Sequence, residues 1–181
     1  MSVTSHRIVL IHLIQMLQYG DGVKIAEIGI GRRGSFVEIF KTIPNLISEY
    51  IAIDPFIPEL STGSHSKKSK STLTMYYQEA CEFASLFPQL SIIKATSPEI
   101  TTSFKDDYFD LVFIDGDHSH EGVKADIEAW SPKIKSWRGF LTGHDYNHNE
   151  PGVVKAVDEA FGENFIIIKR VWIHQKQKKF W

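Results

Sequence analysis

The stretch Ile25-Ala26-Glu27-Ile28-Gly29-Ile30-Gly31-Arg32-Arg33-Gly34 decides how the chain is interpreted. Its pattern predicts a short buried strand over residues 24–30 and a helix from residue 35, with the three glycines in the turn between them. Glycine suits such a turn, because it accepts positive φ and lets a ligand approach the backbone closely. The free N–H groups at the start of the helix would complete a ligand-binding turn, although a plain strand-to-helix turn can carry a similar sequence.

Acidic residues precede and follow this turn at separations along the sequence that suggest a ligand. Glu27 closes the strand two residues before Gly29, and Asp54 ends the next apolar run, 20 residues after Gly34. In dinucleotide-binding α/β folds, an acidic side chain at about that distance meets the ribose hydroxyls of the nucleotide. We therefore expect the ligand of the turn to be an adenosine derivative.

The composition is that of an ordinary globular protein and argues against several classes of function. The chain has 181 residues, 43% hydrophobic and 23% charged, and a net charge of -2, so nothing draws it generally to nucleic acid or anionic membranes. Cys81 is its single cysteine, which excludes an internal disulfide and suits a reducing compartment. The apolar run 8–14 is too short to span a bilayer and lacks the flanks of a signal peptide. We expect a cytoplasmic protein without a membrane or nucleic-acid partner.

Apolar periodicity predicts strands that alternate with helices. The expected strands cover residues 24–30, 49–54, 90–95, 109–114 and 139–142, and the expected helices cover residues 4–19, 35–41, 73–87, 121–134 and 153–161. Residues 165–169 and 171–174 are close enough to form an antiparallel hairpin or two edge strands. The alternation predicts an α/β fold in which helices cover both faces of a parallel sheet, in a single domain over residues 1–181.

Residues 57–72 are almost free of apolar side chains and are rich in serine, with Lys67, Lys68 and Lys70 grouped together. This composition predicts a mobile loop. The loop is either a solvated insertion or a lid that attracts an acidic substrate by charge.

Polar or glycine-rich sequence follows each of the five predicted parallel strands. These segments are Glu27 with the glycines, Asp54, Thr96-Ser97, Asp115-Gly116-Asp117-His118 and His144-Asp145-Tyr146. Ligands of open α/β sheets bind beyond the carboxyl ends of the strands, and a purely structural protein has no need of such groups there. The pattern therefore predicts a functional site at this edge of the sheet.

The same segments resemble a known family. Glu-x-Gly-x-Gly after the first strand, an acidic residue after the second and an acidic turn after the fourth look like class I S-adenosylmethionine-dependent methyltransferases. Residues 113–130 (Phe-Ile-Asp-Gly-Asp-His-Ser-His-Glu-Gly-Val-Lys-Ala-Asp-Ile-Glu-Ala-Trp), 139–146 and 152–159 are similar to the bacterial macrocin O-methyltransferase-like group. The catechol O-methyltransferases are more distant relatives, and the resemblance covers about residues 24–174.

This resemblance implies a Rossmann-like, seven-stranded sheet whose last strand is antiparallel, with S-adenosylmethionine across the strand ends. Residue by residue, Glu27, Gly29 and Gly31 would line the methionine part, and Asp54 would hold the ribose. The cofactor-binding set that we expect is Glu27, Gly29, Gly31, Gly34, Asp54, Thr96, Ser97 and Asp115, with Thr96 and Ser97 beside the adenine and Asp115 near the reacting methyl group.

Metal-dependent relatives hold a divalent ion between the acidic residue after the fourth strand and a pair of residues after the fifth. The corresponding residues here are Asp115, His144 and Asp145, and His144 departs from the usual acidic or amide residue. This donor set suits Mg, Mn, Fe or Zn. We expect the catalytic residues among Asp115, His118, His144 and Asp145, with His118 or His144 as the base if no metal binds. Asp117 can belong to the site or merely cap the next helix.

The sequence thus predicts a methyltransferase that O-methylates a small hydroxylated molecule, such as a sugar or a natural-product intermediate. An NAD-dependent oxidoreductase is the enzyme alternative, because Gly29, Gly31, Gly34 and Asp54 also fit that fingerprint. Two features argue against an oxidoreductase: Glu27 stands just before the glycines, and no second catalytic domain is obvious. A nucleotide-binding module without catalysis is a third reading. A homo-oligomer is compatible with the sequence, since Phe180-Trp181 could dock on a partner subunit or form a frayed end.

Overall fold

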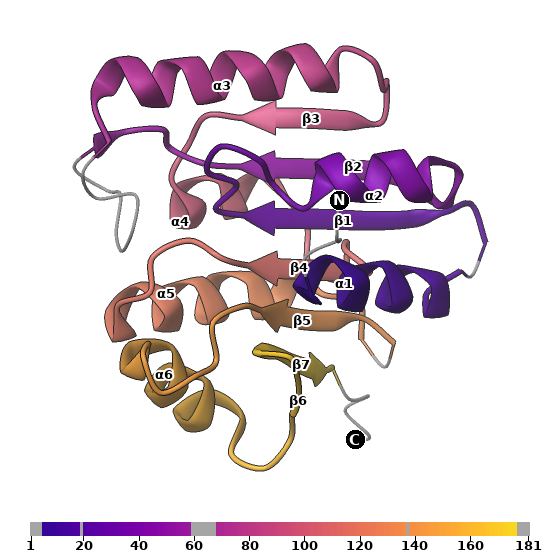
Figure 1. Cartoon of the computed structure of the whole chain (residues 1–181). Coiled ribbons are helices and arrows are strands. Elements are labelled where there is room, and N and C mark those ends of the chain that lie inside the picture. Colours follow the sequence, from indigo (N-terminus) through magenta and orange to yellow (C-terminus); the bar gives the residue numbers. More distant parts are fainter. Residues whose placement is uncertain (1–4, 19, 59–67, 137, 177–181) are drawn as a thin grey trace.

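The computed structural model describes residues 5–18, 20–58, 68–136 and 138–176 (Figure 1). Its helices are α1 (Ser5–Met16), α2 (Phe36–Thr42), α3 (Lys70–Ala84), α4 (Ser97–Ile100), α5 (His120–Trp130) and α6 (Pro151–Phe161). Its strands are β1 (Val23–Ile28), β2 (Ile47–Ile53), β3 (Leu90–Ile93), β4 (Leu111–Ile114), β5 (Phe140–Gly143), β6 (Ile166–Ile168) and β7 (Val171–Gln175). Short 3₁₀ turns lie at Pro44–Leu46, Thr101–Ser103 and Ser131–Lys133. The first five strands agree with their predicted bounds to within two residues.

The described strands form one seven-stranded sheet in the order β3-β2-β1-β4-β5-β7-β6. Strands β1 to β5 pair in parallel, whereas β7 runs antiparallel to both of its neighbours, β5 and β6. The predicted mostly parallel sheet with an antiparallel last strand is confirmed, as is the hairpin of β6 and β7. The chain crosses from β3 at one edge to β4 beside β1, so the ends of β1 and β4 lie at the switch point where such sheets bind ligands.

Helices cover both faces of the sheet, as the alternation of elements predicts (Figure 1). Successive residues of a strand point to opposite faces, so each central strand contributes to two cores. Leu111 and Phe113 of β4 pack with side chains of α1, α2 and α3, whereas Val112 and Ile114 pack with those of α5 and α6. No helix in the described part of the chain is long and apolar enough to cross a membrane.

Helix α3 begins earlier than its apolar pattern predicts. Its first residue is Lys70, because the Ser69 hydroxyl accepts a hydrogen bond from the backbone N–H of Thr72 at 3.2 Å and caps the helix. The prediction of a loop over residues 57–72 is therefore wrong for its last three residues. Residues 59–67, with Lys67, lie outside the described residues, and the mobility of that segment stays a prediction.

Helix α5 also has a serine cap. The Ser119 hydroxyl accepts a hydrogen bond from the backbone N–H of Gly122 at 3.0 Å, so the helix begins at His120. Asp117, which the sequence also offered as the cap, accepts the backbone N–H of Ser119 at 2.9 Å instead. Asp117 thus stabilises the turn before the helix and does not cap the helix.

The glycine turn is anchored to a buried carboxyl group. Glu27, at the end of β1, accepts hydrogen bonds from the backbone N–H groups of Ser35 (2.6 Å) and Phe36 (3.3 Å) and from the Tyr50 hydroxyl (2.8 Å). It satisfies N–H groups that the start of α2 would leave without a partner, and it joins β1, β2 and α2. Burial raises the pKa of Glu27 to about 7, although the hydrogen bonds from Ser35 and Tyr50 oppose that shift.

Gly29 and Asp54 fix the shape of the turn. Gly29 has a φ of +80°, and a Cβ there would overlap the backbone carbonyl of Asp115. The glycine is therefore required by contact between the turn and the end of β4, whereas the sequence suggested that it makes room for a ligand. Asp54 Oδ2 accepts hydrogen bonds from the backbone N–H groups of Ile30 (3.1 Å) and Gly31 (3.0 Å) and holds the turn from the β2 side.

Replacing Gly29 by alanine is expected to lower the free energy of unfolding by roughly 3 kcal/mol or more, because backbone strain and overlap with Asp115 act together. Gly20→Ala is the matched control, since Gly20 has a φ of +81° but nothing within 4 Å of an added Cβ. It should cost only about 1–2 kcal/mol. Denaturant unfolding of both variants measures the difference, and equal losses would show that strain alone explains Gly29.

The raised pKa of Glu27 predicts a pH-dependent stability. Between pH 4.5 and about 7 the unfolded chain ionises this group while the folded chain keeps its proton, so stability falls as pH rises through that window. The free energy of unfolding of the wild type, relative to Glu27→Gln, should therefore drop by about 3 kcal/mol across it. Urea unfolding of both proteins at several pH values tests this, and a pH-independent difference would contradict it.

Candidate active site

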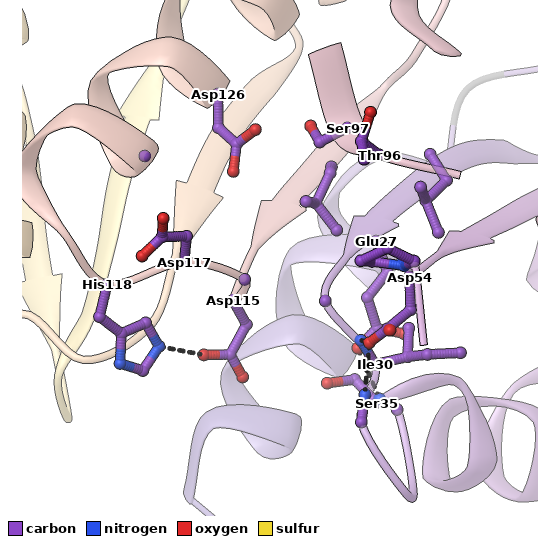
Figure 2. A pocket seen from close by; sticks show the side chains of 18 of the residues that line it. Glu27, Ile30, Ser35, Asp54, Thr96, Ser97, Asp115, Asp117, His118 and Asp126 are labelled. Carbon is purple, nitrogen blue, oxygen red and sulfur yellow. Dashed lines mark hydrogen bonds and ion pairs between the residues drawn. The ribbon is translucent and has the colours of Figure 1, made fainter. Parts of the chain in front are cut away.

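A cleft of about 780 Å³ opens beyond the carboxyl ends of the central strands. Its lining includes every residue that the sequence nominated for cofactor binding: Glu27, Gly29, Gly31, Gly34, Asp54, Thr96, Ser97 and Asp115. Figure 2 shows Glu27 and Asp54 on one side of this space, and Asp117 and Asp126 on the other. The strand ends that looked polar in the sequence therefore share one cavity, while the role of each residue stays a prediction.

Asp54 faces the cleft with part of its hydrogen-bonding capacity already used. Oδ2 takes the two N–H groups of the glycine turn, and Oδ1 accepts the backbone N–H of Phe56 at 2.7 Å. A carboxylate accepts about four hydrogen bonds, so Oδ1 can still accept one from a ligand hydroxyl. Asp54 both supports the turn and faces the cleft, so its removal would disturb the turn as well as the cleft.

The cleft is acidic. Its lining carries Glu27, Asp54, Asp115, Asp117, Asp126, Asp145 and Glu150, against Arg7, Arg32 and Arg33. Arg32 also lies toward the surface, where its Nε is 3.3 Å from Glu79 Oε2. This excess of carboxyl groups in a partly enclosed space favours a ligand that carries positive charge.

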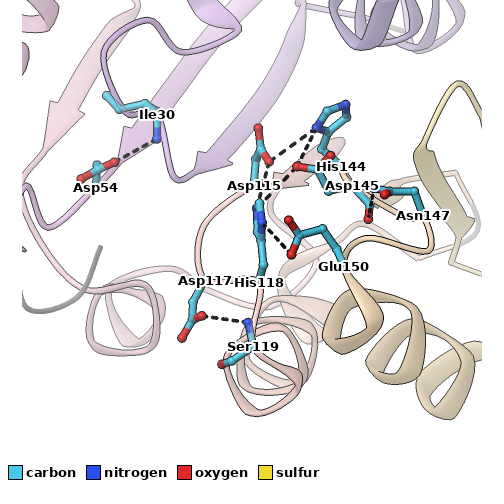
Figure 3. A network of polar contacts seen from close by, with 10 residues as sticks. All are labelled: Ile30, Asp54, Asp115, Asp117, His118, Ser119, His144, Asp145, Asn147 and Glu150. Atoms are coloured by element: carbon cyan, nitrogen blue, oxygen red, sulfur yellow. Dashed lines mark hydrogen bonds and ion pairs between the residues drawn. The ribbon is translucent and has the colours of Figure 1, made fainter. Parts of the chain in front are cut away.

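A second group of side chains converges where β4 and β5 end. The backbone ladder continues past both strands, since the N–H of Asp115 donates to the Ile28 carbonyl (2.7 Å) and that of His144 donates to the Ile114 carbonyl (3.0 Å). Asp115 and His144 therefore lie side by side, and Asp145 follows. Ligand atoms of Asp115, His144 and Asp145 all lie within 4.8 Å of one another, which confirms that the three converge (Figure 3).

The histidines connect the carboxyl groups of this cluster. His144 Nδ1 lies 3.3 Å from Asp145 Oδ2 and 3.8 Å from Asp115 Oδ1. His118 Nε2 lies 3.6 Å from Asp115 Oδ1 and 3.7 Å from Asp145 Oδ2, and its Nδ1 lies 3.6 Å from Glu150 Oε2. Asp145 has a φ of +55°, a conformation that only a few non-glycine residues adopt readily, aspartate among them. The local backbone thus turns Asp145 back toward the cluster.

These contacts shift the pKa values of the cluster. The Asp115 carboxyl raises the pKa of His118 to about 8, even though burial opposes this. Burial lowers the pKa of His144, but Asp145 and Asp115 outweigh it and the net shift is upward. His144 lowers the pKa of Asp145, whereas burial raises the pKa of Asp115. The histidines therefore tend to carry protons that offset the charge of the clustered carboxylates.

Two residues of α1 line the cleft although nothing in the sequence singled them out. The His6 ring centroid lies 4.5 Å from that of His144, and burial followed by the charge of His144 lowers the pKa of His6 to about 4. Arg7 Nη2 donates to the Arg33 carbonyl at 2.8 Å, and Arg7 Nε is buried with no hydrogen-bond partner among the described residues. Only tertiary packing brings the first turn of α1 to the strand ends, so no local pattern could reveal these residues.

Asp126 and Glu150 are further cleft residues that the sequence analysis passed over. Asp126 is 5% exposed on α5, four residues after Gly122, which also lines the cleft. Glu150 immediately precedes α6 and faces His118. The spacing of Gly122 and Asp126 places them on one face of a helix, and this was the available signal for Asp126.

Comparison with known proteins identifies the family. The sequence profile of a family described as methyltransferase domain matches residues 27–146, more than half of the chain. The uncharacterized protein y4gI of Sinorhizobium fredii (strain NBRC 101917 / NGR234) is 28% identical over 108 residues, which cover 60% of this chain. The match covers only 11% of that much longer relative.

Solved structures share the fold. The O-methyltransferase NovP superposes with a TM-score of 0.69 at 18% identity, covering 96% of this chain and 80% of NovP. CalS11, a TDP-rhamnose 3'-O-methyltransferase of calicheamicin biosynthesis, gives a TM-score of 0.59 at 14% identity, covering 94% of this chain and 78% of CalS11. These similarities do not favour the NAD-dependent oxidoreductase alternative. Because the profile match spans the glycine turn and the Asp115 and His144 strand ends, the chain belongs to the methyltransferase-domain family, with a class I S-adenosylmethionine-dependent methyltransferase fold.

Proposed function

We propose that this protein transfers the methyl group of S-adenosylmethionine to a hydroxyl oxygen of a small molecule, such as a sugar or a natural-product intermediate. The observation that carries the proposal is that Asp115 belongs both to the cofactor cleft and to the cluster with His144 and Asp145. A cofactor bound under the glycine turn would thus present its methyl group to groups able to activate a hydroxyl. CalS11, which methylates a sugar hydroxyl, is an example of this fold used for such an acceptor.

The cleft fits S-adenosylmethionine in charge and in hydrogen-bonding groups. Its carboxyl groups suit the sulfonium and ammonium cations, and Asp54 Oδ1 retains one acceptor position for a ribose hydroxyl. The buried Arg7 Nε needs an acceptor, and it lies beside the glycine turn that Arg7 contacts through Arg33. We assign it to the carboxylate of the methionine part, because that is the one anionic group of the cofactor.

The second cluster fits a divalent metal ion. Two carboxylates and an imidazole, with ligand atoms within 4.8 Å of one another, form a donor set that Mg, Mn, Fe or Zn accepts. Asp115, His144 and Asp145 would hold the ion. Such an ion supplies Lewis acidity, which favours the deprotonated form of a bound hydroxyl.

The residues of the site then align and assist the reaction. Methyl transfer from a sulfonium is an in-line displacement, so most of the acceleration comes from holding the acceptor oxygen opposite the sulfur. Asp115 positions the two halves of the site, since its backbone packs on Gly29 and its carboxylate faces both histidines. His6, uncharged and packed on His144, forms a wall of the acceptor side.

Without a metal ion, a ring nitrogen of His144 or His118 would have to take the proton of the hydroxyl. With a pKa of about 8, His118 Nε2 is mostly protonated at neutral pH and could act as a base only at higher pH. Activity that persists in EDTA and rises through pH 8 would indicate this route. Tight cofactor binding without transfer to any hydroxylated acceptor would instead support a non-catalytic nucleotide-binding module.

Arg7→Ala is expected to weaken the binding of S-adenosylhomocysteine roughly 10- to 100-fold, through the loss of charged hydrogen bonds to its carboxylate. Lys155→Ala is the matched control, because that exposed side chain pairs with Glu159 and does not line the cleft. It should change the affinity less than about threefold. Isothermal titration calorimetry measures both, and equal effects would remove Arg7 from the carboxylate site.

Metal binding is expected to require Asp145 but not Asp117. Calorimetric titration with Mn²⁺ should show one site that Asp145→Ala abolishes and Asp117→Ala retains. Because the neighbouring carboxyl groups raise the pKa values of His118 and His144, metal binding should be accompanied by proton release, seen by comparing buffers of different ionisation enthalpy. Full transferase activity in EDTA, with no Mn²⁺ binding, would exclude the metal.

A further inference from the structure

The sheet ends at β6 (Ile166–Ile168), and all three residues of this edge strand are isoleucine. Their exposed fractions are 59%, 48% and 42%, in chain order. Neighbouring residues of a strand point to opposite faces, so neither face of β6 is fully covered by the described part of the chain. The other edge strand, β3, differs, because the exposed residues there are Ser91 and, just past its end, Lys94.

The backbone of β6 is also open on one side. In the described sheet it pairs with β7 alone, so the N–H and carbonyl groups that point away from β7 have no strand partner there. Lys169 and Arg170 join the two strands and have φ values of +50° and +70°, as two-residue hairpin turns of type I′ require. This tight turn keeps β6 extended. An extended edge with open backbone groups and apolar side chains is a template for another strand.

The two ends of β6 carry opposite charges. Glu163 precedes the strand, Lys169 and Arg170 follow it directly, and all three residues are exposed. A second β6 strand that runs antiparallel to the first brings the acidic end of each copy beside the basic end of the other, and symmetry repeats this contact. A parallel neighbour of the same sequence would place like charges together. The charge pattern therefore favours a second copy of this chain, in antiparallel orientation, as the occupant of the edge.

We propose that two copies of this chain associate through antiparallel pairing of their β6 strands, so that two seven-stranded sheets become continuous across a two-fold axis. The contact closes on itself, because each copy offers the same edge and the same isoleucines to the other. A strand of three residues buries less surface than a standard protein interface, so the dimer is weak, with micromolar rather than nanomolar affinity. This inference does not depend on the proposed methyl transfer.

Sedimentation velocity of the full chain, from low micromolar to submillimolar concentrations, tests the proposal. The wild type should pass from monomer to dimer over this range. Ile167→Lys places a charge in the middle of the apolar edge and should weaken the association by about 10-fold or more. Leu86→Lys is the matched control, because Leu86 is 70% exposed and lies in the turn before β3, the strand at the opposite edge of the sheet. It should dimerise as the wild type does.

Charge reversal tests the orientation of the strands and does not depend on Ile167→Lys remaining folded. Glu163→Lys places like charges at both ends of the antiparallel pair and should weaken the dimer, and adding Lys169→Glu should restore part of the affinity. Thermal unfolding confirms that each variant is folded.

A wild type that stays monomeric at every concentration would overturn the proposal. If the Ile167 amide of such a monomer were protected from hydrogen exchange, the edge would belong to another occupant, such as residues 177–181, which lie outside the described residues. A dimer that neither Ile167→Lys nor Glu163→Lys weakens would also overturn the proposal, because its interface would lie elsewhere on the chain.

Discussion

A carboxyl group buried beneath the glycine turn joins three elements that would otherwise meet mainly through apolar side chains. Glu27 receives donors from the start of α2 and from Tyr50 on β2, while its own backbone belongs to β1. A polar group this deeply buried is tolerated only when its hydrogen bonds are made, so the arrangement specifies one geometry for the turn. The shape of that turn, and with it the lining of the cleft, depends on this arrangement.

The sheet positions the other half of the site, where Asp115 and His144 lie. Parallel strands that share hydrogen bonds end at nearly the same level, and the ladder continues one residue beyond β4 and β5. Asp115 and His144 are neighbours for that reason alone. Like charges brought together in this way repel, and the neighbouring carboxyl groups raise the pKa values of His118 and His144, whose protonated forms relieve that repulsion. The geometry that assembles the cluster thus also places its carboxyl groups against the two histidines.

Much of this arrangement could be predicted from the sequence, because it depends on patterns along single segments. Apolar runs located the first five strands, and polar residues after them located the cleft and the convergence of Asp115, His144 and Asp145. Helix starts were less predictable, since the caps at Ser69 and Ser119 depend on side-chain hydrogen bonds that compete with the apolar pattern. Residues contributed by packing alone, such as His6 and Arg7, left no trace in the sequence.

The reason for a residue was harder to predict than its importance. Gly29 was expected to make room for a ligand, yet its missing side chain makes room for the carbonyl of Asp115. The glycine turn and the end of β4 are therefore in direct backbone contact, so a change of shape in one is passed to the other. For protein engineering, the glycine turn and the end of β4 are poor places for substitution, whereas α1 reaches the cleft through the side chains of His6 and Arg7. A new shape of the cleft is best sought at those α1 side chains, because the start of α6 packs through Gly152 on the backbone of His118 and His120.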